Sequence, residues 1–331
     1  MINKKKKVAV FGLGIHQIDG IKNLKKFFSV YGFDDNKEAY GVKYVNYYVN
    51  IALKEKNKIL KYLKQKKINY LFSFCSEATL PLLYFLYDKL NKNKSYSELL
   101  KKVSNKNIFR KNLLKYNIKN PKFSLLKSKN QFSINKIIKP VVGSGSKNIV
   151  VINKSNINNL KLKNYNNHII EDYFKGEMYA IDGFCIKDKF HGVALSKKFR
   201  DNNSPLIDKK IIFNYQNKDL FQKACVLAQK CCLAVNAQNV PIHFEFILTS
   251  THKIYPIDFA VRGAGSGLFD YCLSELMNHE ASDYQIKLQL NKKIYFKKKK
   301  RVFFYLYFLT SRRIKKMKKM NLKFLTKKKL K

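Results

Sequence analysis

The chain has 331 residues and a formal net charge of +45, from 67 lysine and arginine residues against 22 aspartate and glutamate residues. Only six of the basic residues are arginine, and the other abundant types (Asn, Ile, Phe and Tyr) also have A/T-rich codons, so a nucleotide-biased genome explains the charge. A protein that binds nucleic acid specifically would instead interleave aromatic residues with clustered arginines.

Cysteine spacing and the lengths of apolar runs set further limits. The six cysteines show no C-x-x-C pair and no zinc spacing, so we expect reduced core thiols in a cytoplasmic protein. No apolar run reaches the roughly 20 residues that span a bilayer, so we expect no transmembrane segment. The length allows two or three domains, each with a full core.

The N-terminal part predicts a small parallel sheet. Residues 7–14 read as a strand that enters a glycine turn, and a helix then precedes a strand at residues 30–33. Residues 69–74 predict a later strand, and Ser76 and Glu77 begin the helix after it. Glu77 either contacts substrate or stabilises the start of that helix by its charge.

The segment 139–148 is the most informative part of the chain. A helix is expected over residues 104–118 and is broken by Pro121, and the segment follows it. Its glycines let backbone N–H groups approach phosphate oxygens, and Lys139 adds a point charge, so the segment predicts a polyphosphate site. Its spacing differs from the Walker and dinucleotide-binding motifs. The alternative is a serine-glycine hairpin between two strands.

Three later segments place carboxylates in or after apolar strands. A strand at residues 149–152 follows the glycine loop, and residues 169–177 carry acidic side chains at the end of another strand. Further along, Glu245 and Asp258 stand among apolar neighbours. Because an unpaired buried carboxylate is costly, a cation is the expected partner; the alternative is that both side chains face solvent.

These segments, in this order, resemble the ATP-grasp ligases. The resemblance implies an α/β and α+β multidomain fold, with an N-terminal parallel βαβ domain followed by a two-lobed ATP-grasp fold. The expected parts are an N-terminal pre-ATP-grasp domain at 1–103, a first lobe with connecting helix and glycine loop at 104–175, a second lobe with the metal site at 176–290, and a basic C-terminal β appendage at 291–331.

Within this family, the chain looks most like the carbamoyl-phosphate-synthase-like and amino-acid-ligase-like members. The features that carry this likeness are Gly12, Gly14 and Gln17 near the N-terminus and the closing segment from Asp258 to Gly267.

The resemblance also implies a nucleotide site on the first lobe. Lys106 and Lys139 would be the phosphate-binding lysines. The other contacts with ATP would come from the glycine loop (Gly143, Ser144, Gly145, Ser146 and Lys147), from the adenine hinge (Glu171, Asp172, Tyr173 and Phe174) and from Glu177 at the ribose.

A metal site is implied next to the phosphates. Glu245 and Asp258 would bind Mg²⁺, for which Mn²⁺ can substitute, and Arg262 and Lys139 would be the catalytic cations. Asp258 replaces the usual glutamate, and Ala260 stands where many members have a metal-binding asparagine. The number of bound ions, one or two, is therefore left open.

The region between the hinge and the metal strands would select the substrate, with Arg200 or Lys197 as a carboxylate anchor and His191 as a third candidate. The implied reaction joins a carboxylate to an amine, or to a thiol, through an acyl phosphate and releases ADP and phosphate. Expected partners are small-molecule carboxylate and amine substrates, no specific nucleic acid, and optionally a second copy of the chain.

Two alternatives stay open at this point. One is a non-catalytic nucleotide-binding module that keeps the fold with a weakened metal site. The other is a basic protein that binds nucleic acid.

Overall fold

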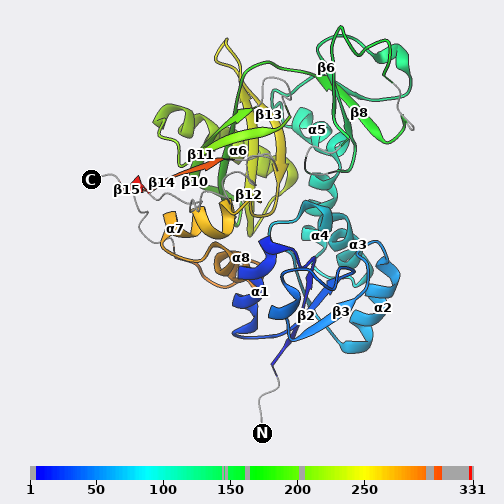
Figure 1. Ribbon diagram of the computed structural model, residues 1–331, viewed down its shortest axis with the longest axis vertical. Coiled ribbons are helices and arrows are strands. Elements are labelled where there is room, and N and C mark those ends of the chain that lie inside the picture. Colours follow the sequence, from blue (N-terminus) through cyan, green and yellow to red (C-terminus); the bar gives the residue numbers. More distant parts are fainter. Residues whose placement is uncertain are drawn as a thin grey trace, which may run out of the picture.

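The computed structural model describes residues 5–143, 145, 148–160, 165–200, 206–295, 302–307 and 328–329. Figure 1 shows an N-terminal domain at the bottom of the view, a small lobe at the upper right and a larger lobe at the upper left. A parallel α/β domain is thus followed by two lobes built on antiparallel sheets, which confirms the predicted fold class.

The N-terminal domain is a parallel sheet in the strand order β3-β2-β1-β4. Val8 and Val10 of β1 pack into one core cluster and Ala9 and Phe11 into another, so both faces of the sheet are covered. Its elements are β1 (Lys7–Phe11), η1 (Ile15–Gln17), α1 (Ile18–Lys25), β2 (Ser29–Asp34), η2 (Val42–Tyr44), β3 (Tyr47–Asn50), α2 (Lys56–Lys66), β4 (Tyr70–Phe72), η3 (Glu77–Thr79), α3 (Leu80–Lys89) and α4 (Lys94–Ser104).

The strand order of this sheet reverses at β1, which lies between β2 and β4. Parallel α/β sheets offer a crevice to ligands at such a point, outside the carboxyl ends of the strands. Glu77 follows β4 and is placed at this crevice.

The first lobe is an antiparallel sheet in the order β5-β8-β6-β7, preceded by one helix. Leu126, Ile138, Ile152 and Ile170 form its small core. The elements are α5 (Lys106–Lys115), β5 (Phe123–Leu125), η4 (Lys129–Gln131), β6 (Lys136–Pro140), β7 (Val150–Ile152) and β8 (His168–Asp172).

The second lobe is a sheet in the order β13-β12-β9-β10-β11-β14-β15. The strand at residues 302–307, expected in a separate C-terminal appendage, pairs with β11 and extends this sheet. The elements are β9 (Glu177–Ile186), β10 (Lys189–Arg200), β11 (Asp208–Phe213), α6 (Lys218–Val235), β12 (Val240–Leu248), β13 (Ile254–Ala260), the π-helix η5 (Leu268–Leu273), α7 (Ser274–Met277), α8 (Ala281–Gln289), β14 (Val302–Tyr307) and β15 (Lys328–Lys329).

Helix α6 packs on one face of the large sheet against β9 and β10. Its start is capped because the Asn217 side chain accepts a hydrogen bond from the Leu220 backbone N–H at 2.9 Å, and it ends at Asn236 in the left-handed conformation (φ 60°). The buried stripe recurs every three or four residues, at Leu220, Ala224, Ala228, Cys231 and Val235.

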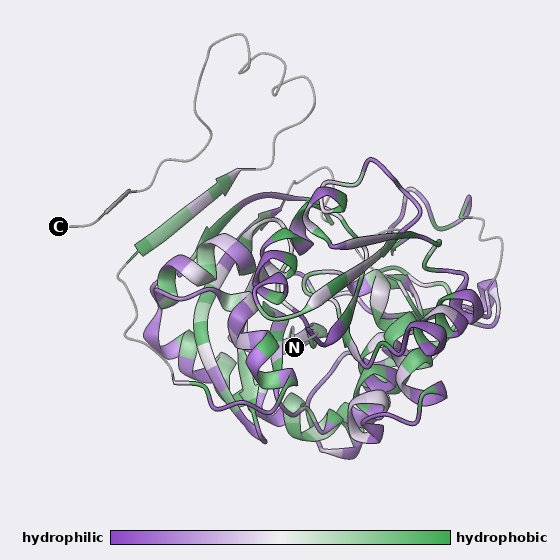
Figure 2. Cartoon of the chain, turned by 90° about the horizontal axis from the view of Figure 1, so that it is seen from below, coloured by the Kyte–Doolittle hydropathy of each residue, from purple (hydrophilic) through white to green (hydrophobic). Residues whose placement is uncertain are grey.

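The two faces of the large sheet differ in chemistry. On β12, Phe244 and Phe246 belong to the core cluster that includes α6, whereas His243 and Glu245 alternate with them and face the other way. Figure 2 shows hydrophobic colour concentrated on strands and in alternating bands along the helices. The strand alternation therefore places a row of polar side chains opposite α6.

Buried polar contacts hold the second lobe on the N-terminal domain. Asn23 of α1 donates to Ser282 of α8 at 2.9 Å, and Gln285 of α8 donates to the Ser73 carbonyl at 2.8 Å. All of these side chains are buried, so each contact supplies a partner that a buried polar group requires.

We expect Gly20→Ala to destabilise the protein. A Cβ at Gly20 of α1 would lie 2.2 Å from the ring of Phe74, so the helix or the ring must move. Overpacking of this kind lowers the free energy of unfolding by about 1–3 kcal/mol, to be measured by urea denaturation.

Gly14→Ala is the matched control, because a Cβ at Gly14 meets nothing within 4 Å. Its free energy of unfolding should change by less than about 0.5 kcal/mol. Equal destabilisation by both substitutions would contradict the packing described for Gly20.

Candidate functional site

Two connected cavities lie where the two lobes and the N-terminal domain meet. The larger has a volume of about 950 Å³, which suits a small-molecule ligand, and its lining runs from β7 of the first lobe to the polar face of the large sheet. The narrower cavity shares Gly145, Ile149, Leu206, Glu245 and Asp258 with it. A ligand in one cavity can therefore reach the other.

Most residues predicted to hold the nucleotide line the narrower cavity. They are Lys106, Lys139, Gly143, Gly145, Glu171, Asp172, Tyr173 and Phe174. Ser144, Ser146 and Lys147 lie outside the described residues. The structure thus gathers segments that are far apart in the sequence, and their contacts with a nucleotide stay a prediction.

Lys106 is tied to the glycine segment. It is the first residue of α5, which Asn105 caps by accepting from the Ile108 N–H at 3.0 Å. The Lys106 backbone N–H donates to the Val141 carbonyl and its ammonium donates to the Gly143 carbonyl, both at 2.9 Å. The ammonium is therefore held at the base of the loop.

Glu171 is buried between two cations. Arg110 Nε donates to Glu171 Oε1 at 2.8 Å, and Lys139 Nζ donates to Glu171 Oε2 at 2.8 Å; all three side chains are buried. Burial alone would raise the pKa of Glu171, but Arg110 and Lys139 lower it to about 2. Burial lowers the pKa of Lys139, against the attraction of Glu171.

Arg110 also links the two lobes. Its Nη1 donates to the Pro256 carbonyl at 2.8 Å and its Nη2 to the Ile257 carbonyl at 3.0 Å, both on β13 of the second lobe. The same guanidinium therefore binds β8 of the first lobe through Glu171.

The hinge after Glu171 is fixed on both sides. Asp172 pairs with Lys136 at 2.5 Å, and the Tyr173 N–H donates to the Asn135 carbonyl at 2.8 Å. Phe174 stacks on Tyr255 of β13, with ring centroids 4.0 Å apart. The hinge thus presents a planar, partly apolar wall to the narrower cavity.

Glu245 and Asp258 are direct cross-strand neighbours on β12 and β13. Both line the two cavities, which confirms that their side chains turn inward. Within the described part of the chain, the carboxylate of Asp258 has no hydrogen-bond or ion-pair partner. A carboxylate pair with one unpaired member is a suitable place for a cation.

The described residues contain no group of three or more His, Cys, Asp or Glu side chains arranged to hold a metal. Mg²⁺ does not require such a cage, because in nucleotide sites it is bound by one or two carboxylates together with phosphate oxygens and water. Glu245 and Asp258 fit that pattern.

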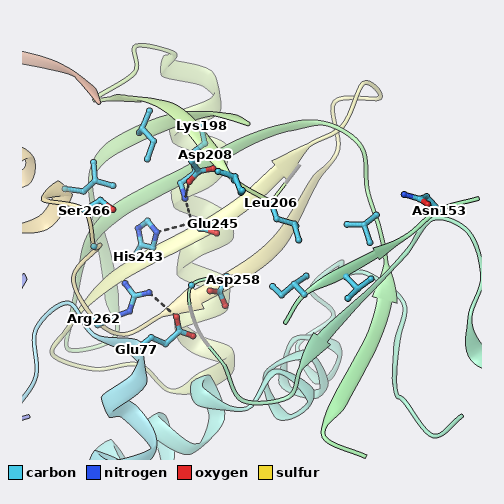
Figure 3. A pocket seen from close by; sticks show the side chains of 18 of the residues that line it. Glu77, Asn153, Lys198, Leu206, Asp208, His243, Glu245, Asp258, Arg262 and Ser266 are labelled. Carbon is cyan, nitrogen blue, oxygen red and sulfur yellow. Dashed lines mark hydrogen bonds and ion pairs between the residues drawn. The ribbon is translucent and has the colours of Figure 1, made fainter. Parts of the chain in front are cut away.

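A chain of charged groups continues from Glu245 across the sheet (Figure 3). His243 Nε2 lies 3.4 Å from Glu245 and His243 Nδ1 lies 2.8 Å from Asp182, while Lys198 pairs with Glu245 and, at 3.0 Å, with Asp208. Burial alone would lower the pKa of His243, but Asp182 and Glu245 raise it to about 9, so the ring is a cation at neutral pH.

Lys198 and Glu245 stabilise each other's charged forms. Burial disfavours the ammonium, yet Glu245 and Asp208 raise the pKa of Lys198. Burial also disfavours the carboxylate, yet Lys198 and His243 hold the pKa of Glu245 well below its ordinary value.

Arg262 lies where the N-terminal domain meets the second lobe. Its Nη2 donates to Glu77 at 3.1 Å and its Nη1 to the Gly263 carbonyl at 2.9 Å. Burial and the nearby Asp258 raise the pKa of Glu77. Of the two roles considered for Glu77, the structure supports a place in the cavity wall, next to Arg262.

Of the predicted site residues that the structure describes, three do not line either cavity: Glu177, Lys197 and His191. Glu177 begins β9 and is exposed, where it pairs with Lys197 and accepts from the Tyr179 hydroxyl at 2.7 Å. His191 lies near the start of β10, opposite Phe184. Arg200 does line the narrower cavity, 3.6 Å from Asp208.

Strand alternation explains why Lys198, and not Lys197, faces the site. Neighbouring residues of a strand point to opposite faces, and Lys197 lies beside Tyr179 and Tyr215 on the side of α6. His243 was missed although it stands two residues before Glu245, which is the spacing of residues that share a face.

Arg110 was also missed as a site residue. The signal was present: in a chain that uses lysine almost everywhere, a retained arginine indicates a need for several directed hydrogen bonds. The same argument holds for Arg262 and Arg200 among the predicted site residues.

A protein-family model, described as the ATP-grasp domain, matches residues 103–238, which span the first lobe and much of the second. Residues 103–238 therefore match an ATP-grasp domain. This match, together with the fold, agrees with the predicted resemblance.

Solved ATP-grasp structures cover nearly the whole chain. An L-amino acid ligase from Bacillus licheniformis superposes with a TM-score of 0.76 at 18% identity, over 93% of this chain and 81% of that one. An N5-carboxyaminoimidazole synthetase from Staphylococcus aureus in complex with ADP gives 0.77 at 14% identity, over 96% and 86%.

A third similar structure is the biotin carboxylase domain dimer of a 2-oxoglutarate carboxylase from Hydrogenobacter thermophilus, in complex with MgADP, ADP and bicarbonate. It gives a TM-score of 0.73 at 12% identity, over 92% of this chain and 74% of that one. At these identities the likeness establishes the fold alone. The sequence has no match among curated proteins.

Among the described residues, no helix has both the length and the apolar character that crossing a bilayer demands.

We expect Arg110→Met to destabilise the protein strongly. The substitution leaves Glu171 with one cation and removes two hydrogen bonds to β13. Breaking a buried ion pair in this way should lower the free energy of unfolding by about 3–5 kcal/mol in urea denaturation. Arg110→Lys, which keeps the charge, should lose less. If Arg110→Met had the same free energy of unfolding as the wild type, the Arg110 contacts between the lobes would not contribute to stability.

Acid should weaken the protein through Glu171. Its pKa of about 2 lies below the ordinary 4.5, so its contribution to stability is complete above about pH 4.5 and is lost as the pH falls toward 2. This contribution is about 3 kcal/mol. In Glu171→Gln, the free energy of unfolding should depend less on pH over that window, and an unchanged pH dependence would contradict the assignment.

Proposed function

We propose that this protein is an ATP-dependent ligase that activates a carboxylate as an acyl phosphate, joins it to an amine and releases ADP and phosphate. One observation carries the proposal: lysines beside a glycine segment, a cross-strand carboxylate pair and Arg262 line one continuous space between the lobes. Its solved relatives include ligases and complexes with ADP, which supports the same reaction class here.

The nucleotide would occupy the narrower cavity. Its base would lie against the hinge at Tyr173 and Phe174, and its phosphates would run toward Lys106 and Lys139. Gly143 and Gly145 bring backbone close to the phosphates without a side chain in the way. These residues would bind and orient ATP, which accounts for most of the barrier reduction in phosphoryl transfer.

The carboxylate pair would hold Mg²⁺, which supplies positive charge to the phosphate oxygens when bound. Arg262 lines the larger cavity where the N-terminal domain meets the second lobe. Its guanidinium is oriented by the ion pair with Glu77. A fixed cation at the transferring group stabilises the charge that develops there without reorganisation.

The proposed reaction has two steps. An oxygen of the substrate carboxylate forms a bond to the γ-phosphorus as the bond to the ADP oxygen breaks. The amine nitrogen then bonds to the acyl carbon, the carbon–oxygen bond to phosphate breaks, and the nitrogen loses a proton. Among the described residues that line the larger cavity, Ser266 has the one hydroxyl and none has a thiol, which favours direct transfer between the substrates.

The larger cavity would hold the carboxylate and the amine. Arg262 of this cavity and Arg200 of the adjoining narrower cavity are the candidates to receive a carboxylate, because a guanidinium binds it through two parallel hydrogen bonds. Glu77 offers an acceptor to an ammonium group at the same end. Formation of a homodimer and a cytoplasmic location stay predictions.

A panel of carboxylates and amines tests the proposal, with release of ADP and of phosphate as the readouts. At least one pair should stimulate both, and Glu245→Gln and Arg262→Ala should each lower the rate by about 10²–10³-fold, the effect of losing a group that stabilises transition-state charge. Lys223→Gln, on the exposed side of α6, is the control and should keep the wild-type rate.

Equal ATP hydrolysis by the wild type and both site variants, under every condition, would refute the ligase assignment. Binding of ATP without turnover on any substrate pair would instead favour a nucleotide-binding module.

A further inference from the structure

The carboxylate of Glu245 is flanked by two different environments. Figure 3 shows it between Asp258 on one side and Lys198 with His243 on the other. The Asp258 side has a carboxylate that lacks a partner in the described structure, whereas the other side already has a cation. Only the Asp258 side therefore has a carboxylate that a further cation could pair with.

Lys198 is a built-in part of the sheet and not a loose surface side chain. Its side chain is 9% exposed and its ammonium bridges Glu245 of β12 and Asp208 of β11, from a position on β10. It therefore contacts acidic groups of two other strands at once. Two charge-assisted contacts of this kind hold a flexible lysine in one place.

The register of the sheet makes room for this bridge. Strand β9 lies between β10 and β12, and Ala180 of β9 pairs with both Ser196 and Glu245. The side chains of Ala180 and Ser196 are small and share the face of Glu245. Lys198, two residues beyond Ser196 on this face, can extend across β9 to reach Glu245.

The next position on β13 lacks a metal ligand. Ala260 is the cross-strand partner of His243 and shares the face of Asp258. A methyl group offers no oxygen to a cation, so β13 supplies no second ligand beside Asp258. The facing His243 ring contacts Asp182 at 2.8 Å and Glu245 at 3.4 Å, so a further ion would find few free oxygen atoms beside it.

We propose that the ammonium of Lys198 takes the place of a second divalent cation, so that this site holds a single metal ion, between Glu245 and Asp258. The inference rests on the proposed function, because it assumes that a metal–nucleotide complex binds here. It settles the number of ions that the sequence leaves open and assigns a role to a lysine that neither the glycine loop nor the hinge explains.

A count of bound Mn²⁺ tests the inference on the full chain. Free Mn²⁺ is measured by electron paramagnetic resonance in the presence of an equimolar, non-hydrolysable ATP analogue. The wild type should bind one Mn²⁺ per chain. Lys198→Gln should bind two, because Glu245 and Asp208 are then left without their shared cation.

Lys197→Gln is the matched control, since Lys197 directly precedes Lys198 and points to the opposite face of the sheet. It should bind one ion, as the wild type does. Lys198→Met, which keeps the length of the apolar stem, provides a second variant if Lys198→Gln does not fold, and it should also bind two.

Two ions in the wild type, or one ion in a folded Lys198 variant, would overturn the inference and leave the ligase proposal standing. Failure of the wild type to bind the ATP analogue at all, measured by calorimetry in the same buffer, would remove the proposed function and the inference with it.

Discussion

A carboxylate removed from water must be matched by positive charge, and the placement of the two lobes depends on how Glu171 meets that requirement. Its partners come from separate elements: Arg110 from α5 and Lys139 from β6. Arg110 also donates hydrogen bonds to β13. The ion pair that neutralises Glu171 therefore also joins the first lobe and its connecting helix to the second lobe. The narrower cavity lies beside this cluster and takes its shape from it.

The second lobe obtains a site and a core from the same strands. Alternate residues of β12 pack under α6 or face the cavity, so the aromatic residues that stabilise the sheet also fix the direction of Glu245 and His243. A shift of one residue in register would bury the carboxylate against α6 and expose the phenylalanines. The chemistry of the site is therefore protected by the packing of the opposite face.

Sequence patterns predicted what depends on local order. The parallel opening, the glycine segment after β6 and the carboxylates of β12 and β13 are each visible within about ten neighbouring residues. Contacts between distant segments were not: Arg110 and Glu171 are 61 residues apart, and nothing local marks them as partners. Lys198 was passed over for Lys197 because the phase of a strand must be known to within one residue. Glu177 was assigned by resemblance, and its exposed pairing with Lys197 depends on the geometry of β9 and β10.

Arg110 holds β13 through main-chain oxygen atoms, at Pro256 and Ile257, and not through side chains. Every amino acid has a backbone carbonyl group. Substitutions at these two positions, such as those caused by a codon bias, therefore keep the acceptors of the Arg110 hydrogen bonds. The arginine has no such freedom, because an ammonium cannot direct bonds to a carboxylate and to two carbonyls in one plane. The mutational bias that enriched this chain in lysine can thus change the residues at positions 256 and 257, whereas Arg110 must be retained.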